Sequence, residues 1–175
     1  FERLTQPNEE IKKIADGLRG KTEQQTLENV LFFLEENLKH IDLERENPKE
    51  WKKLFNKRAV EEILENKISY GCNDTATAFT TLMRSCGIPI KYIEGKRIGK
   101  SGTHDWGEVF VDGEWKSVDP TQGREGLKFD PKKVKHGPYI KISESLGPSD
   151  SMITSYEDWI RLEKLWDYKK NILKN

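Results

Sequence analysis

Cysteine is scarce in this sequence: Cys72 and Cys86 are the two that occur among 175 residues. Two cysteines do not make the disulfide framework that staples small secreted domains, so stability must come from an apolar core. The length suits one domain, and we expect residues 1–175 to form a single domain. Long apolar runs are also missing, which predicts that no segment of this chain inserts into a membrane.

An excess of charge of either sign is absent as well. The chain carries 30 Lys and Arg against 30 Asp and Glu, so nothing indicates nucleic acid or an anionic membrane as the partner. The aromatic content of 10% separates the sequence from disordered chains. The sequence starts at Phe1 rather than Met, so a removed signal or anchor stays open, and neither compartment nor oligomeric state is predicted.

Helical spacing of apolar residues dominates the first half. Residues three and four apart predict a helix over residues 22–38 and a second one over about residues 57–64. The stretch 41–56 is charged and contains Pro48, and we expect irregular structure there. A third helix is expected over residues 72–85, because a glycine frees the backbone at its start and a Gly-Ile-Pro segment ends it.

Strand-like alternation follows the third helix. Residues 104–111 and 114–119 predict two antiparallel strands joined by a two-residue Asp112-Gly113 turn. A short strand is expected over residues 90–93, and a glycine- and lysine-rich loop over residues 95–103. Helices that precede an antiparallel sheet indicate the α+β class.

The C-terminal third of the sequence is the least informative part. Its prolines indicate a loop-rich region after residue 120. A final amphipathic helix is expected over about residues 155–173, with Trp159, Leu162 and Trp166 at packing intervals. The sequence assigns no role to this third.

Cys72 lies at the predicted junction between a loop and the third helix. A thiol at a helix start feels the positive end of the helix dipole, which favours the thiolate and predicts a lowered pKa, although the nearby Asp74 opposes this effect. The position alone is equally compatible with a buried, inert cysteine. Cys86 ends the same helix and is expected to pack in the core.

The hairpin register places His104 and Asp119 close together. A two-residue turn sets the residues that flank it opposite each other, so Trp106 lies opposite Asp119, and His104 is its diagonal neighbour on the same face. A carboxylate that binds one imidazole nitrogen orients the ring and leaves the other nitrogen for a thiol. We therefore interpret Cys72, His104 and Asp119 as a catalytic triad.

Alternative sites find less support in the sequence. Residues 95–101 resemble a phosphate-binding loop, but three residues rather than four separate the glycines, and a strand follows. A metal site built from the triad lacks a close-spaced ligand pair, and no acidic loop has calcium spacing, so we expect neither metal nor cofactor. His40 and His136 lack such neighbours and are expected at the surface.

Together these segments resemble the core of the transglutaminase-like superfamily. In that family a Gly-Cys junction opens a helix that ends in Arg-x-x-Gly-Ile-Pro, followed by a His-x-Trp-x-Glu-Val strand, a turn with Gly and Trp, and Asp-Pro-Thr. The corresponding segments here are Gly71-Cys72, Arg84 to Pro89, His104 to Val109, Asp112 to Trp115 and Asp119-Pro120-Thr121. The specific match covers about residues 57–121. Asp105 and Gly107 depart from it, because many relatives have small or apolar residues at these two positions.

The resemblance implies a papain-like α+β fold, in which the helix with the cysteine packs on the sheet with the histidine and the aspartate. It implies acyl transfer on a protein or peptide amide through a thioester, with hydrolysis preferred and protein-glutamine crosslinking as the alternative. A non-catalytic peptide- or protein-binding module on the same fold is an alternative of another class. The backbone N–H of Cys72 is one expected oxyanion donor, and Trp106, Tyr70 and Asn66 are candidates for a second donor or for the cleft.

Overall fold

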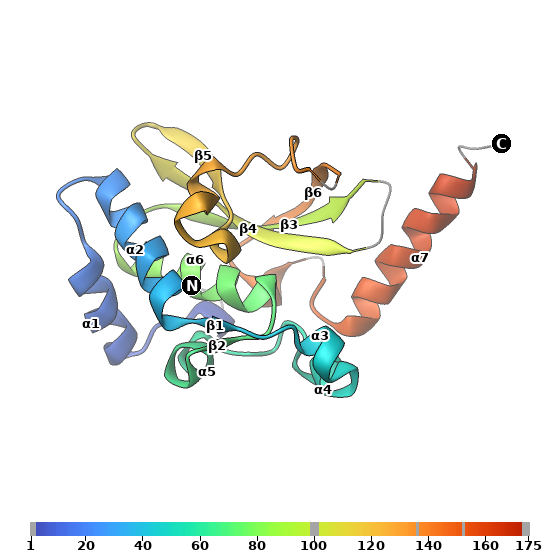
Figure 1. Ribbon diagram of the computed structural model, residues 1–175, viewed down its shortest axis with the longest axis horizontal. Helices are drawn as coiled ribbons and strands as arrows, with labels where there is room; N and C mark the ends of the chain where they lie inside the picture. Colours follow the sequence, from blue (N-terminus) through green and yellow to red (C-terminus); the bar gives the residue numbers. More distant parts are fainter. Residues whose placement is uncertain (1–2, 99–101, 136, 152, 173–175) are drawn as a thin grey trace.

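The computed structural model describes residues 3–98, 102–135, 137–151 and 153–172. A helical layer covers one face of a four-stranded sheet, as Figure 1 shows. The helices are η1 (Arg3–Thr5), α1 (Glu9–Leu18), α2 (Glu23–Asn37), α3 (Leu43–Glu46), α4 (Pro48–Leu54), α5 (Val60–Asn66), α6 (Cys72–Ser85), η2 (Pro120–Lys128), η3 (Pro148–Asp150) and α7 (Tyr156–Ile172). The strands are β1 (Lys39–His40), β2 (Ile68–Ser69), β3 (Ile90–Arg97), β4 (Thr103–Val111), β5 (Glu114–Val118) and β6 (Tyr139–Ser145).

Helix α6 lies at the centre of the molecule. It packs on β3 and β4 of the sheet and is surrounded by α1, α2 and α5, and its residues 73–83 are all buried. The helix begins directly after Gly71 and ends before Gly87, whose φ of 87° is left-handed. The helix predicted over residues 72–85 is therefore confirmed, and so is the α+β class with this helix packed on an antiparallel sheet.

The larger sheet has the strand order β5-β4-β3-β6 and is antiparallel throughout. The turn between β4 and β5 consists of Asp112 and Gly113, with φ values of 57° and 83°, as a two-residue hairpin turn requires. Val111 pairs with Glu114, which confirms the predicted register. The start of β4 and the end of β5 consequently lie side by side.

Strand β3 is longer than expected, and the loop predicted over residues 95–103 is wrong at both ends. Pairing with β4 on one side and β6 on the other extends β3 to Arg97. Gly95 lies inside this strand. A Cβ at this position would be only 2.2 Å from the Trp106 ring, so a side chain here would clash with the indole. The glycine therefore provides room for an indole and does not break the strand.

The segment predicted to be irregular, residues 41–56, contains the two short helices α3 and α4. Asp42 and Asn47 cap their first turns by accepting from backbone N–H groups. Pro48 occupies the first helical position of α4, where a missing N–H costs nothing.

Strand β6 differs from the prediction of a loop-rich region after residue 120.

Helix α7 extends away from the rest of the chain in Figure 1. Its Glu163 carboxylate accepts from the Gly102 N–H at 3.0 Å and pairs with the buried Lys96 ammonium at 3.0 Å. These contacts fasten α7 beside the start of β4. Among the helices that the structure describes, none is both long and apolar enough to cross a membrane.

Candidate active site

A cavity of about 620 Å³ opens between the first turn of α6, the start of β4, the α3–α4 region and α7. The side chains and backbone that line it include Cys72, His104 and Asp105. Its remaining lining residues are His40, Asp42, Glu44, Trp51, Phe55, Tyr70, Gly71, Asn73, Gly102, Thr103, Thr121 and Trp159. The cavity thus joins a thiol at a helix start with an imidazole on the adjacent sheet.

Cys72 is the first residue of α6 and is partly exposed to the cavity. Its backbone N–H belongs to the first helical turn, where amide groups have no acceptor within the helix. Its Sγ lies 3.8 Å from the Oδ2 of Asp105, to which the thiol donates. His104 also interacts with the sulfur electrostatically.

His104 and Asp119 are joined by a hydrogen bond of 2.8 Å between Nε2 and Oδ2. The Asp119 carboxylate, which is 1% exposed, also accepts from the Thr121 backbone N–H at 3.0 Å and from the Gln122 side-chain amide at 2.6 Å. These bonds fix the carboxylate, and the carboxylate fixes the ring. Because Nε2 is engaged, Nδ1 is the imidazole nitrogen left for another partner.

Three aromatic rings pack against the imidazole. The centroids of Tyr139, Phe129 and Trp106 lie 5.3, 6.1 and 6.4 Å from that of His104. Such packing limits rotation of the ring and lowers the polarity around the His104–Asp119 hydrogen bond.

The charges of the histidine–aspartate pair stabilise each other. Burial alone would lower the pKa of His104, but hydrogen bonds and charges at Asp119 and Cys72 raise it well above its usual value. Burial would raise the pKa of Asp119, yet the hydrogen bond and charge of His104 leave it below its ordinary value. Both shifts favour an imidazolium beside a carboxylate.

The thiol and its neighbouring acid behave differently. Burial, followed by the charge of Asp105, raises the pKa of the Cys72 thiol, whereas the interaction with His104 opposes this. The prediction that the helix start lowers the pKa of Cys72 is therefore wrong, because it included neither the burial of the thiol nor the Asp105 carboxyl at 3.8 Å. Burial also raises the pKa of Asp105, to about 6.

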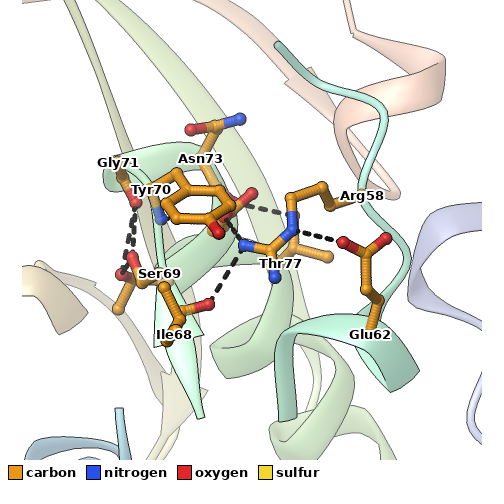
Figure 2. Close-up of polar contacts among 10 residues, drawn as sticks. Arg58, Glu62, Ile68, Ser69, Tyr70, Gly71, Asn73 and Thr77 are labelled. Carbon is orange, nitrogen blue, oxygen red and sulfur yellow. Dashed lines mark hydrogen bonds and ion pairs between the residues drawn. The ribbon is translucent and has the colours of Figure 1, made fainter. Parts of the chain in front are cut away.

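Figure 2 shows how the turn before α6 is held in place. The Arg58 guanidinium pairs with Asp74 and donates to Glu62 at 2.9 Å and to the Ile68 carbonyl at 3.0 Å. The Asp74 carboxylate also accepts from the Tyr70 backbone N–H at 2.9 Å. The backbone that leads into the first turn of α6 is thus tied to a buried ion pair.

The three candidates for the cleft or a second oxyanion donor lie in different places. Tyr70 lines the cavity, and its ring is stacked by the Arg58 guanidinium, 4.3 Å from the centroid. Trp106 is buried behind His104 and is not among the residues that line the cavity. Asn66 is exposed at the end of α5 and is also not among them.

The remaining sequence candidates are placed as follows. Cys86 is buried and donates to the Ala15 carbonyl at 3.3 Å, which confirms its role in core packing. His40 is exposed, as expected, but it also lines the rim of the cavity. His136 lies outside the described residues. Within the described part of the chain, no group of three or more His, Cys, Asp or Glu is arranged to hold a metal ion.

Apart from Tyr70, sequence reasoning did not place the aromatic side chains that line the cavity there. Trp51 lies in α4 and Phe55 directly follows that helix, in a segment predicted to be irregular, and Trp159 lies in α7. The Trp51 ring lies edge-to-face on both others, with centroids 5.1 and 5.9 Å apart. The spacing of tryptophans in the C-terminal helix indicates that Trp159 packs against other side chains. It does not indicate that Trp159 lines the same cavity as Cys72.

Comparisons with known proteins identify the fold. A family model described as the transglutaminase-like superfamily matches residues 5–120. Among solved structures, the chain is similar to a "putative cysteine protease" from Cytophaga hutchinsonii, with a TM-score of 0.62 and 18% identity. That match covers 86% of this chain and 46% of the other, so this chain spans about half of that structure. A structure described as a TGase matches with a TM-score of 0.46 and 16% identity over 64% of this chain and 30% of that one. No curated protein matches the sequence.

Proposed function

The chain belongs to the transglutaminase-like superfamily, and from this premise we propose that it is a cysteine-dependent hydrolase of protein or peptide amides that works through a thioester. The observation that carries the proposal is the convergence in one cavity of the Cys72 thiol and the His104 imidazole, with Asp119 bound to the ring at 2.8 Å. This is the constellation that nucleophilic acyl transfer needs: a nucleophile, a base and an orienting carboxylate.

The proposed reaction has two halves. The Cys72 thiolate attacks the carbonyl carbon, the carbon–nitrogen bond breaks, and the His104 imidazolium gives its proton to the leaving amine. Water then attacks the thioester while His104 takes a proton from it, and the thiolate leaves. The net change is amide plus water to carboxylic acid plus amine. Asp119 keeps the ring oriented and stabilises its charged form in both halves.

The oxyanion of each tetrahedral intermediate needs donors near the sulfur. The backbone N–H of Cys72 suits this role because it has no acceptor within α6. Tyr70 is the candidate for a second donor, since it lines the cavity whereas Trp106 and Asn66 do not. Replacement of Tyr70 by Phe tests this: a loss of kcat without a change in KM supports an oxyanion role.

The cavity lining also suggests which peptides fit. Aromatic rings of Trp51, Phe55 and Trp159 form one side, while Asp42 and Glu44 bring acidic groups to the rim. We therefore infer a preference for peptides with apolar or basic residues beside the reactive amide, because acidic ones would be repelled. A peptide panel that varies this neighbouring residue measures the preference as kcat/KM.

The central experiment compares wild type with Cys72→Ala and Cys86→Ala on a panel of glutamine-containing peptides. Release of amine or ammonia by wild type and Cys86→Ala, but not by Cys72→Ala, supports the proposal. Unchanged peptide binding in Cys72→Ala, with no turnover by any variant, would instead support a binding module.

Crosslinking is the alternative outcome of the same chemistry. If a primary amine rather than water attacks the thioester, the amine is incorporated into the peptide. Adding a labelled primary amine to the panel separates the two, because hydrolysis releases ammonia without incorporating label. Incorporation that outpaces hydrolysis would replace the hydrolase by a transglutaminase.

A further inference from the structure

Asp105 is a buried carboxyl directly under the nucleophile, and the reaction proposed above does not use it. It is 7% exposed and follows His104 on β4, so the two side chains point to opposite faces of the sheet. Gly107, two residues on, faces α6, since a Cβ there would lie 2.7 Å from the Phe79 ring. Asp105 therefore faces α6 too, and its Oδ2 meets the Cys72 sulfur at 3.8 Å.

Several titratable groups surround Asp105 besides the Cys72 thiol. Glu94 of β3 is its directly opposed pairing partner and is 1% exposed. Tyr92, also on β3 and buried, interacts with it electrostatically, as do His104 on its own strand and Asp119 beyond β5. Within the described residues, no Lys or Arg forms an ion pair with Asp105. Burial and, to a smaller extent, the charge of Asp119 disfavour ionisation of Asp105, whereas the charge of His104 and the contacts with Tyr92 and Cys72 favour it.

We propose that Asp105 is a positioning residue for Cys72, whose carboxylate holds the thiol proton and so makes ionisation of the nucleophile depend on a second acid besides His104. The inference deepens the proposed function and rests on Cys72 being its nucleophile. The contact gives each charge state a distinct effect. An ionised Asp105 accepts the S–H hydrogen and repels a thiolate. A neutral Asp105 donates to the sulfur instead, which leaves a thiolate beside the imidazolium of His104.

The two states exchange near the pKa of Asp105, which burial raises to about 6. Below that pH the thiolate forms beside a neutral acid, and its amount increases as the pH rises. Just above it, a thiol with an ionised Asp105 and a thiolate with a neutral Asp105 hold the same number of protons. The thiolate fraction therefore stays level until the pH approaches the raised pKa of the thiol.

The test is the rate of Cys72 alkylation by iodoacetamide as a function of pH, followed by mass spectrometry with Cys86 in the same chain as the internal reference. Asp105→Asn removes the charge and keeps the shape. Lowering the pKa of a thiol by one unit raises its thiolate about tenfold and lowers its intrinsic reactivity about threefold. We therefore expect Asp105→Asn to react faster than wild type above pH 6, about threefold for each unit by which the substitution lowers the pKa of the thiol, with the rates converging at lower pH.

Asp112→Asn is the matched control, because it makes the same substitution in an exposed turn of the same hairpin. It should leave the rate profile unchanged. Equal profiles for wild type and Asp105→Asn, or slower alkylation of Asp105→Asn at every pH with its circular dichroism unchanged, would overturn the proposal.

The wild-type chain provides a second reading that does not depend on the folding of a variant. Its rate should rise with pH, level off above about pH 6 and rise again, whereas a single rise would contradict the inference. Alkylation requires no substrate, so these results stand apart from the turnover lost in Cys72→Ala. A chain with no turnover but a two-step profile would lose the proposed function and keep the thiol–carboxyl coupling.

Discussion

Arg58 and Asp74 form an ion pair that is almost fully shielded from solvent, with side-chain exposures of 1% and 4%. Burial raises the pKa of Asp74, and the Arg58 charge opposes that rise. The pair joins the segment just before α5 to the first turn of α6, so it holds the backbone beside the Cys72 thiol without contacting the thiol itself.

Removal of Arg58 should therefore cost stability. Arg58→Ala leaves a buried carboxylate without its partner, and we expect the free energy of unfolding to fall by about 3–5 kcal/mol. Urea unfolding followed by tryptophan fluorescence measures the loss. The control is Arg161→Ala, whose pair with Asp158 is exposed and should contribute less than about 1 kcal/mol. Equal, small losses in both variants would contradict a structural role for the buried pair.

Asp119→Asn should change the titration of His104. The amide keeps the shape of the carboxylate but not its charge, so the pKa of His104 should fall from its raised value toward the ordinary range. Proton NMR of the imidazole in a His40→Gln, His136→Gln background follows this single ring. Turnover at neutral pH should drop by roughly 10²–10⁴-fold. An unchanged titration would mean that Asp119 does not stabilise the imidazolium.

Asp105→Asn should alter how stability depends on pH. Because the pKa of Asp105 rises from 3.8 to about 6 on folding, the folded chain holds this proton more tightly than the unfolded chain. Its contribution is fully present below about pH 4 and is lost as the pH rises to about 6. The stability of Asp105→Asn relative to wild type should thus increase by at most about 3 kcal/mol over this range. Unfolding midpoints across this pH range measure it, and a constant difference would refute it.

Gly126→Ala should disturb the site through the backbone. A Cβ at Gly126 would lie 1.9 Å from the Asp119 carbonyl oxygen, so one of the two segments has to move. We expect a loss of about 1–3 kcal/mol and a weaker effect of Asp119 on the titration of His104. Gly17→Ala is the comparison, because nothing lies within 4 Å of its added Cβ in α1. It should stabilise the chain by up to about 1 kcal/mol. Similar effects of both changes would argue against the steric account.

Local sequence signals were sufficient for the hairpin and for the central helix. Asp112-Gly113 selects a two-residue turn, and the turn fixes the register, which in turn brings His104 beside Asp119. The resemblance to the transglutaminase-like superfamily, based on short motifs along this part of the chain, is confirmed by the family match. Contacts close in sequence are predictable because few alternative pairings compete with them.

Long-range contacts were not predictable in the same way. Strand β6 pairs with β3 from more than 40 residues away, and the composition of β6 does not predict which strand it pairs with. Asp105 was visible as a departure from the family pattern, but its effect on Cys72 depends on how α6 sits on the sheet. The aromatic lining of the cavity has the same origin, since Trp51 and Trp159 belong to distant helices.

The three residues proposed to act in catalysis lie in two different layers of the fold. His104 lies on β4 and Asp119 directly follows β5 of the same hairpin, so the geometry between their side chains does not depend on how the helices sit over the sheet. The Cys72 sulfur lies on α6, in the other layer, so a shift of one layer over the other changes its distances to the His104 ring and to the Asp105 carboxyl, which both belong to β4. A ligand that shifts the layers relative to each other would therefore weaken the proposed reaction while the histidine–aspartate hydrogen bond stays intact.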